Sequence, residues 1–332
     1  MKIDLHAHIL PENWPDFKKQ FGYGGWVTLE RTSDGKAMML KNGQPFRPVD
    51  ERVWSPAARL KDMNDTGVDV QVLSTVPVMF SYWAPAADAH TVSRFLNDNI
   101  AETVASNPDR FLAFGTVPLQ DPMRAAEELK RCKMELNLSG IQIGTHVDDR
   151  NIGDPFFDPF LKAAADLDMP LFIHPWDMRD QGRHSKYWLP WLVGMPAETT
   201  QAALSLMFSG AFERFPNLRV CLAHGAGSLP YTISRAKHAF DVYPGAMKID
   251  NDRDPMSYFK TSQLFADTLV HNEHSLDLAL EVMGHDNLIL GSDYPFLLGE
   301  HHPGKLIEGT RYSIELKEKL LHSNARRFLN LS

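Results

Sequence analysis

The sequence lacks three features that would assign it to a particular class of protein. It contains only two cysteines, Cys132 and Cys221, in unrelated segments, which excludes a disulfide framework. No apolar run approaches the ~20 residues that a membrane-spanning helix requires. With 34 Lys and Arg against 42 Asp and Glu, a formal net charge of −8 argues against a nucleic-acid or anionic-membrane partner. No stretch is typical of a signal peptide, so we expect a cytoplasmic protein.

The composition that remains is that of an ordinary globular protein, with 43% hydrophobic and 23% charged residues. Short β-rich runs alternate along the chain with longer amphipathic stretches. The β-rich runs are Ile3–His8, Val68–Val76, Phe111–Val117, Ser139–Gly144, Leu171–His174, Arg219–His224, Gln263–Asp267 and Leu288–Asp293. The amphipathic stretches are Ala57–Thr66, Ala89–Ser106, Met123–Leu136, Phe157–Asp168, Thr199–Phe212, Leu229–Phe240, Ser275–Met283 and Ile314–Phe328. Eight alternating pairs predict an α/β fold, a (β/α)8 TIM-type barrel, as a single domain over residues 1–332.

Two long segments interrupt the repeat. Residues 10–56 follow the first strand and contain short β-like runs around a turn at Asn42-Gly43. Residues 175–198 follow the fifth strand and are rich in Trp, Pro and Met. Because the loops after the strands build the active-site face of such barrels, we expect both segments to form walls of a pocket. Residues 10–56 are predicted to be an insertion subdomain within the barrel domain.

Two histidines stand one residue apart in the first strand, at His6 and His8. Side chains at positions i and i+2 of a strand project from the same face. Neutral imidazole is the commonest metal ligand at physiological pH, so the pair is half of a candidate metal site. A solvent-facing strand that happens to carry two histidines explains the pair equally well when it is considered alone.

Further candidate ligands stand where other predicted strands end. His174, His224 and Asp293 each follow an apolar run, at the edge of the barrel where catalysis occurs. Each of them alone could be a hydrogen-bonded core residue or a helix cap. Such polar groups at the ends of strands one, five, six and eight would be costly to bury unpaired, whereas a divalent ion would stabilise the whole set. The pattern therefore favours a metal site.

This pattern of ligands resembles that of the amidohydrolase superfamily: HxH after the first strand, His after the fifth and sixth, and Asp after the eighth. Many members with two metals also carry a lysine at the end of strand four, where this chain has Gly144-Thr145-His146. The resemblance therefore implies one metal ion per subunit, held by His6, His8, His174 and Asp293, with water completing the sphere. Imidazole and carboxylate ligands suit zinc, and ligand type leaves manganese and iron open.

Longer motifs resemble one family within this superfamily, the 2-amino-3-carboxymuconate 6-semialdehyde decarboxylases. The segments that carry this resemblance are Phe21–Trp26, Thr75–Trp83, Gln142–His146, His174–Met178, Trp188–Thr199 and Gly291–Phe296. The family removes CO2 from its substrate to give 2-aminomuconate 6-semialdehyde in tryptophan breakdown through kynurenine. One departure is Gly225-Ala226-Gly227, where the family usually has three consecutive glycines. The resemblance implies a zinc-dependent carboxy-lyase.

The substrate of that family is a small dicarboxylate, and the resemblance assigns it cationic partners. Arg47 matches a carboxylate-binding arginine, whose guanidinium can bind a carboxylate through two hydrogen bonds. Arg235 matches a second arginine that reaches in from the neighbouring subunit, which implies a homodimer with an active site completed across the interface. Lys41 is a weaker companion of Arg47. Without the resemblance, a surface salt bridge for Arg47, a helix-face charge for Arg235 and a solvated Lys41 are the ordinary interpretations.

Aromatic and apolar side chains of the same segments are predicted to contact the substrate. The candidates for this apolar wall are Trp176, Met178, Trp188, Trp191 and Phe296, although aromatic residues in long loops more often serve local packing. For His224 we predict proton transfer, as a general base and then a general acid, because three imidazoles and a carboxylate already fill the protein share of the metal site.

Two other classes of function compete with this prediction. The first is a decarboxylase, hydrolase or hydratase that acts on a related muconate or aromatic acid with the same ligands. The second is an inactive, metal-binding barrel that serves as an interaction or sensing module. The second predicts a disrupted ligand or base, and all five positions are filled here.

Overall fold

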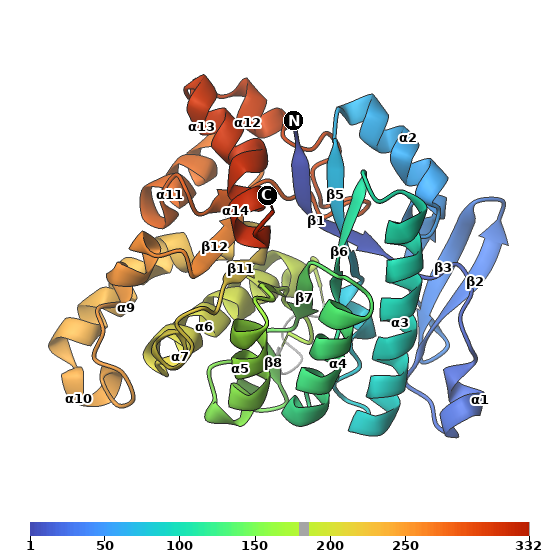
Figure 1. The fold of residues 1–332 in the computed structure, drawn as a ribbon, viewed down its shortest axis with the longest axis horizontal. Helices are drawn as coiled ribbons and strands as arrows, with labels where there is room; N and C mark the ends of the chain where they lie inside the picture. Colours follow the sequence, from blue (N-terminus) through green and yellow to red (C-terminus); the bar gives the residue numbers. More distant parts are fainter. Residues whose placement is uncertain (179–185, 332) are drawn as a thin grey trace.

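The computed structural model describes residues 1–178 and 186–331. Its largest sheet has eight strands in the order β1-β5-β6-β7-β10-β11-β12-β13, with parallel pairing throughout (Figure 1). These strands are β1 Ile3–Ile9, β5 Val70–Thr75, β6 Phe111–Gly115, β7 Gly140–Ile143, β10 Leu171–Ile173, β11 Val220–Leu222, β12 Leu264–Asp267 and β13 Leu288–Ile289. All eight predicted strands are therefore present, in the predicted order.

The two ends of this sheet meet. The Leu5 backbone N–H donates to the Leu290 carbonyl at 2.8 Å, and the His8 N–H donates to the Tyr294 carbonyl at 2.7 Å. Ala7 and Tyr294 form an isolated parallel bridge. The sheet thus curls until the segment after β13 contacts β1, which is consistent with the predicted (β/α)8 barrel.

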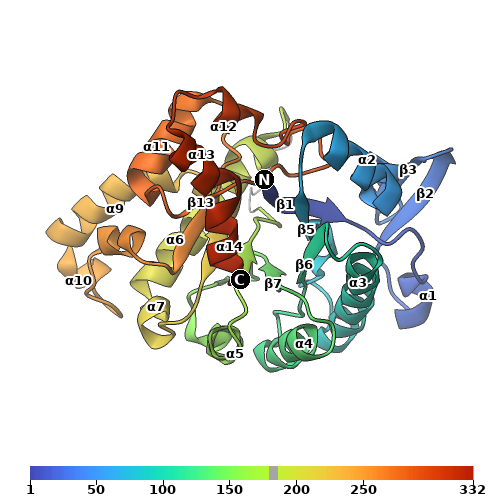
Figure 2. The same ribbon diagram turned by 45° about the horizontal axis from the view of Figure 1, so that its top comes forward.

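Helices cover the outside of the curled sheet, as Figure 2 shows. The long ones are α2 Pro56–Thr66, α3 Ala86–Ser106, α4 Pro122–Met134, α5 Asp158–Asp166, α6 Met195–Phe208, α9 Leu229–Val242 and α11 Glu273–Met283. The short ones are α1 Phe17–Phe21, α7 Ala211–Arg214, α8 Ala223–Ala226, α10 Pro244–Met247, α12 Lys305–Gly309, α13 Ile314–Glu318 and α14 Asn324–Leu329. None of the helices in the described ranges is long and apolar enough to cross a membrane.

Local sequence explains where helices begin and end. Ser55 caps α2, since its hydroxyl accepts a hydrogen bond from the Ala58 N–H, and Pro56 occupies the first helical turn. Gly67 ends the same helix in the left-handed region, with φ of 70°. The predicted helix over 199–212 is divided into α6 and α7 because Gly210, with φ of 71°, interrupts it. The predicted helix over 314–328 is α13 and α14, joined by a π-helical turn at Lys319–Ser323.

The segment between β1 and α2 forms a separate antiparallel sheet of three strands, β2 Val27–Ser33, β3 Lys36–Lys41 and β4 Gln44–Asp50. Asn42 and Gly43 both have positive φ, 55° and 72°, as a two-residue hairpin turn requires. A hydrophobic cluster joins this sheet to the main fold: Trp26 and Met39 pack with Val76 and with Val92 of α3. In Figure 1 the small sheet lies beside α3 at one side of the molecule. This packing fixes β4, which carries Arg47.

A second hydrophobic cluster is formed mainly by buried side chains of the curled sheet. It contains side chains from β1, β5, β6, β10, β11, β12 and β13 together with Phe328 of α14. Phe172 of this cluster contacts the His6 ring, with the ring centroids 4.9 Å apart. The candidate metal ligands therefore lie directly on a close-packed core.

Candidate metal centre and substrate pocket

Four predicted ligands, from distant parts of the chain, come together at one point. His6 and His8 lie on β1, His174 directly follows β10, and Asp293 follows β13. Each residue offers one ligand atom, and these atoms all lie within 4.8 Å of one another. The same-face arrangement expected for His6 and His8 thus exists, and their Nε2 atoms are 3.2 Å apart.

The atoms that face the centre of this cluster fit a divalent cation. Oδ1 of Asp293 lies 3.0 Å from His8 Nε2 and 3.5 Å from His6 Nε2. Nε2 of His174 is buried and has no hydrogen-bond partner, an arrangement that is costly unless another group binds it. Three imidazole nitrogens and one carboxylate oxygen are a donor set typical of zinc, and one that manganese and iron also accept.

The opposite nitrogen of each histidine ring faces a hydrogen-bond acceptor. His8 Nδ1 lies 3.1 Å from the Thr75 carbonyl, and His174 Nδ1 lies 3.0 Å from the Pro175 carbonyl. His6 Nδ1 lies 2.7 Å from Oδ2 of Asp267. With the proton on Nδ1, each ring presents the lone pair of Nε2 to the cluster, as a metal ligand must.

Asp267 is the residue that the sequence analysis missed. It ends the seventh strand, and a carboxylate at the end of an apolar run is the same signal that identified Asp293. The seventh strand was predicted as Gln263–Asp267, and its last residue was not considered as part of the site.

Burial and neighbouring charges set the protonation of the cluster. Burial lowers the pKa of His8, and burial together with the charge of His224 holds the pKa of His174 well below its usual range. Burial opposes ionisation of Asp293, but its hydrogen bond with His8 and the charge of His6 outweigh burial and lower its pKa. The cluster therefore contains an ionised carboxylate beside uncharged imidazoles at His8 and His174, which is the protonation that metal binding needs. Burial opposes a charge on His6, but its hydrogen bond with Asp267 and the charge of Asp293 outweigh burial and raise its pKa.

His224 stands beside the cluster and outside the group of four. Its ring centroid is 4.9 Å from that of His174 and 5.2 Å from that of His6. Burial, then the charge of His6, lowers the pKa of His224 to about 4, and its Nδ1 is buried without a hydrogen-bond partner. His224 at neutral pH is therefore an uncharged imidazole that can accept a proton.

The backbone at His224 differs from the prediction. The sixth strand was predicted over Arg219–His224, whereas β11 ends at Leu222. His224 has φ of 57°, and Gly225, Ala226 and Gly227 also have positive φ, from 61° to 64°. The chain turns sharply here because consecutive residues adopt left-handed conformations, which Ala226 does without the freedom of a glycine.

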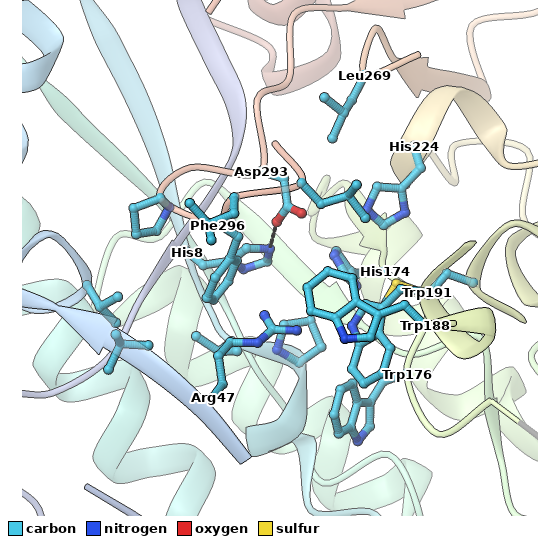
Figure 3. Close-up of a pocket in the computed structure, with 18 of the residues that line it drawn as sticks. His8, Arg47, His174, Trp176, Trp188, Trp191, His224, Leu269, Asp293 and Phe296 are labelled. Atoms are coloured by element: carbon cyan, nitrogen blue, oxygen red, sulfur yellow. Dashed lines mark ion pairs between the residues drawn. The ribbon is translucent and has the colours of Figure 1, made fainter. Parts of the chain in front are cut away.

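A cavity of about 740 Å³ opens onto the cluster and is lined by His8, His174, His224 and Asp293. Arg47 of β4 and Phe296 line it as well, together with Trp188 and Trp191 (Figure 3). The Arg47 guanidinium lies 4.5 Å from the ring centroid of Phe296 and 5.8 Å from that of Trp191. Figure 3 shows Arg47 on one side of the cavity with Asp293 and His224 on the other. Segments around both predicted insertions thus contribute to the wall, although residues 179–185 lie outside the described residues.

Three predicted substrate residues are not among those that line this cavity. Lys41 ends β3, and its ammonium lies 5.5 Å from the ring centroid of Trp176, which does line the cavity. Met178 is partly exposed near Trp176. Arg235 is exposed on α9. The loop after β12 contributes wall residues that the sequence analysis did not name, Leu269, Val270 and His271.

Known proteins resemble this chain over its whole length. A sequence model of the family described as Amidohydrolase matches residues 3–331. The chain is 47% identical, over 332 residues, to a protein of Dictyostelium discoideum named 2-amino-3-carboxymuconate-6-semialdehyde decarboxylase, and the match covers 100% of this chain and 92% of that protein. These two findings agree with the resemblance inferred from the motifs.

Solved structures of decarboxylases are also similar. The 5-carboxyvanillate decarboxylase of Sphingomonas paucimobilis matches with a TM-score of 0.84 and 26% identity, covering 100% of this chain and 99% of that one. A 5-carboxyvanillate decarboxylase of Novosphingobium aromaticivorans matches with a TM-score of 0.76 and 27% identity, covering 85% of this chain and 82% of that one. The latter structure was determined in complex with manganese.

Proposed function

This chain belongs to the amidohydrolase family, and from that premise we propose that it is a metal-dependent decarboxylase of 2-amino-3-carboxymuconate 6-semialdehyde. The reaction removes CO2 without an oxidant and gives 2-aminomuconate 6-semialdehyde. The name of the Dictyostelium relative supports this substrate, and the names of the similar solved structures support decarboxylation. The proposal assigns the protein to tryptophan breakdown through kynurenine.

One observation carries the proposal: a cluster of four ligand atoms and a guanidinium face each other across one cavity. A dicarboxylate needs both features, because one carboxylate must stay bound while the other leaves as CO2. Arg47 can bind the remaining carboxylate through two parallel hydrogen bonds. Phe296 and Trp191 flank its guanidinium and hold it by cation–π contact.

His6, His8, His174 and Asp293 would hold a single divalent ion, and we propose zinc, with manganese as the alternative that the Novosphingobium structure supports. When bound, such an ion supplies a Lewis acid that stabilises negative charge developing on the substrate. Metal analysis of the purified protein, followed by removal of the metal and separate reconstitution with Zn²⁺ and Mn²⁺, decides between them.

His224 moves the proton in this proposal. When the bond between carbon and CO2 breaks, its electron pair stays on the substrate carbon, which must then gain a proton. His224 is uncharged at neutral pH, lies beside the cluster and lines the cavity. It therefore can take a proton from a water molecule early in the reaction and return it to that carbon, as a base and then an acid. The hydroxide left by that water is released together with CO2, so charge and protons balance.

We also propose a homodimer in which Arg235 completes the active site of the partner. Its exposed position on α9, away from the cavity of its own subunit, is compatible with this role. The experiment mixes two inactive variants, His224→Ala and Arg235→Ala, by unfolding and refolding them together. If Arg235 acts across the interface, mixed dimers contain one intact site, and about a quarter of wild-type activity returns. If Arg235 acts within its own subunit, no activity returns.

Three further predictions belong to this proposal. The fold is a closed (β/α)8 barrel and residues 1–332 form one domain, because the hydrophobic cluster around Trp26 and Met39 joins the insertion at 10–56 to α3. The protein is cytoplasmic. Limited proteolysis that releases residues 10–56 as a separately folded unit would contradict the single domain.

The assay that tests the function follows the loss of ultraviolet absorbance of freshly made 2-amino-3-carboxymuconate 6-semialdehyde. The competing function is decarboxylation or hydrolysis of a related muconate or aromatic acid, which the names of the similar solved structures favour. The same preparation is therefore tested with 5-carboxyvanillate and with a panel of lactones. Turnover of the semialdehyde at least ~100-fold more efficient than that of any other compound supports the proposal, and a preference for another compound refutes it.

A further inference from the structure

Asp267 makes an unusual set of contacts at the end of β12. Its side chain is fully buried, and each of its two carboxylate oxygens accepts two hydrogen bonds. Oδ2 faces His6 Nδ1 at 2.7 Å and accepts from the backbone N–H of His224 at 2.9 Å. Oδ1 accepts from the backbone N–H groups of Gly225 at 2.7 Å and Leu269 at 3.1 Å. One carboxylate thus contacts a candidate metal ligand and the turn that carries the candidate proton-transfer residue.

The backbone of the turn at 224–227 donates hydrogen bonds to this carboxylate from His224 and Gly225. Successive backbone N–H groups in such a turn form a concave site for an anion, and Asp267 occupies it. The turn is also closely packed: a Cβ added to Gly225 would lie 2.3 Å from Val270 Cγ1, and one added to Gly227 would lie 2.3 Å from the Pro196 carbonyl oxygen. The left-handed conformation is unfavourable for His224 and Ala226. The hydrogen bonds that the His224 and Gly225 N–H groups donate to Asp267 offset this cost for the turn as a whole.

His6 depends on Asp267 in a way that the other two histidines do not. His8 and His174 each face a backbone carbonyl, which no side-chain substitution removes, and the Ser74 hydroxyl lies farther from His8 Nδ1, at 3.4 Å. The acceptor for His6 is a side-chain carboxylate. A negatively charged carboxylate that accepts a hydrogen bond from Nδ1–H also makes Nε2 a more basic metal ligand.

We propose that Asp267 is a positioning residue that fixes two parts of the reaction centre together, the ring of His6 and the backbone of His224. This inference rests on the proposed function, since it takes His6 as a metal ligand and His224 as the proton-transfer residue. Asp267 holds the His6 proton on Nδ1 and so directs Nε2 to the metal. Through its hydrogen bonds with the backbone N–H groups of His224 and Gly225, Asp267 also keeps His224 at a constant position relative to that metal.

The contacts require a carboxylate and exclude an amide of the same shape. All four partners of Asp267 are donors when His6 carries its proton on Nδ1. In Asp267→Asn, the amide NH2 must face two of these donors in either orientation. Facing Gly225 and Leu269, it disrupts the turn. Facing His224 and His6, it forces the His6 proton onto Nε2, the nitrogen that binds the metal.

The test compares Asp267→Asn with the wild type and with Glu128→Gln. Glu128 is a matched control because it is also a fully buried carboxylate, which accepts from Arg131 and Asn97 between α3 and α4. Metal-free proteins are titrated with Mn²⁺, and free Mn²⁺ is followed by its electron paramagnetic resonance signal. We expect Asp267→Asn to raise the Kd for Mn²⁺ about 10- to 100-fold, and Glu128→Gln to leave it unchanged.

Turnover at saturating Mn²⁺ gives a second readout. We expect kcat of Asp267→Asn to fall up to about 100-fold, because His224 is displaced, with KM changed less than about threefold. A Kd and kcat equal to those of the wild type would overturn the proposal. The proposal would also be overturned if Glu128→Gln, at an equal loss of thermal stability, lost as much Mn²⁺ affinity and kcat as Asp267→Asn. That result would show that Asp267 has a structural role only. A wild type that binds no Mn²⁺ or Zn²⁺ would instead refute the proposed function.

A measurement on the wild type keeps the proposal testable if Asp267→Asn fails to fold. Nitrogen-15 spectra of histidine-labelled, metal-free protein report which ring nitrogen carries the proton, and the His6 signals are assigned from their loss in His6→Gln. We expect His6 to be protonated at Nδ1 without any metal. A His6 ring whose Nδ1 carries no proton in the metal-free protein would overturn the proposal.

Discussion

The four candidate ligands and the cavity wall that faces them are held by different kinds of structure. The ligands stand on strands or within a few residues of strand ends, where backbone hydrogen bonds of the parallel sheet define each position. The wall consists of Arg47 on the small β2–β4 sheet, Trp191 in the π-helical turn Pro190–Gly194 before α6, and residues of the loop after β12. The candidate metal site is thus part of the barrel scaffold, whereas the cavity wall that faces it is built by segments added to that scaffold. Changes in the first region should affect the metal, and changes in the second should affect substrate binding alone.

The largest effect is expected for Asp293→Ala, which removes the one carboxylate of the cluster. Because metal binding contributes several kcal/mol of charge stabilisation, we expect turnover to fall more than about 1,000-fold and bound metal to be lost. Metal content per chain and kcat are measured together. Asp241→Ala, on the exposed face of α9, is the control, and retention of full metal content by Asp293→Ala would show that Asp293 is not a metal ligand.

The second largest effect is expected for His224→Ala, which tests whether His224 is a metal ligand or a proton-transfer residue. His224→Ala is expected to lower kcat about 100- to 10,000-fold, the range of general acid–base catalysis, while metal content stays that of the wild type. His238→Ala, an exposed histidine of α9, is the control. Loss of one metal per chain with His224→Ala would show that His224 belongs to the ligand set.

In the cavity wall, Arg47→Gln should act on substrate binding and leave the metal in place. Hydrogen bonds to a charged group are worth about 1.5–3 kcal/mol, so we expect KM to rise about 10- to 100-fold. Arg47→Lys keeps the charge and loses the two-point contact, and should recover only part of this loss.

The matched comparison for Arg47 is Lys41→Gln, which changes a cation outside the cavity lining. We expect its KM to stay within about threefold of the wild type, because its ammonium faces Trp176 and such partly exposed contacts contribute little. An increase in KM as large as that of Arg47→Gln would place Lys41 in the substrate site, as the family resemblance implies.

The smallest effect is expected for Trp191→Phe. A smaller ring weakens the cation–π contact with Arg47, which is worth about 0.5–1 kcal/mol, so KM should rise about two- to fivefold with kcat unchanged. Trp83→Phe is the control, because Trp83 packs against Trp26 and outside the cavity lining. A fall in kcat or in metal content with Trp191→Phe would contradict the separation of wall and metal site.

The sequence predicted that the four candidate ligands lie together, because each of them could be recognised from its own neighbours. His6 and His8 have the spacing of one strand face, and His174 and Asp293 each follow an apolar run. The positions of Lys41 and Met178 outside the cavity lining could not be predicted, since they depend on the twist of the β2–β4 sheet and on the path of a loop. Neither of these leaves a local pattern in the sequence.

Asp267 shows where local reasoning ends. Its position at the end of a strand could be predicted, but its four donors come from His6, 261 residues away, from a turn 42 and 43 residues away, and from Leu269. Strand order, periodicity and the identity of the ligands follow from short-range chemistry, which is why the amino-acid pattern alone was enough for them. The contact of Asp267 with both His6 and the backbone of His224 exists only after the sheet curls and brings separate strand ends within hydrogen-bond distance. Packing of the whole chain therefore decided it.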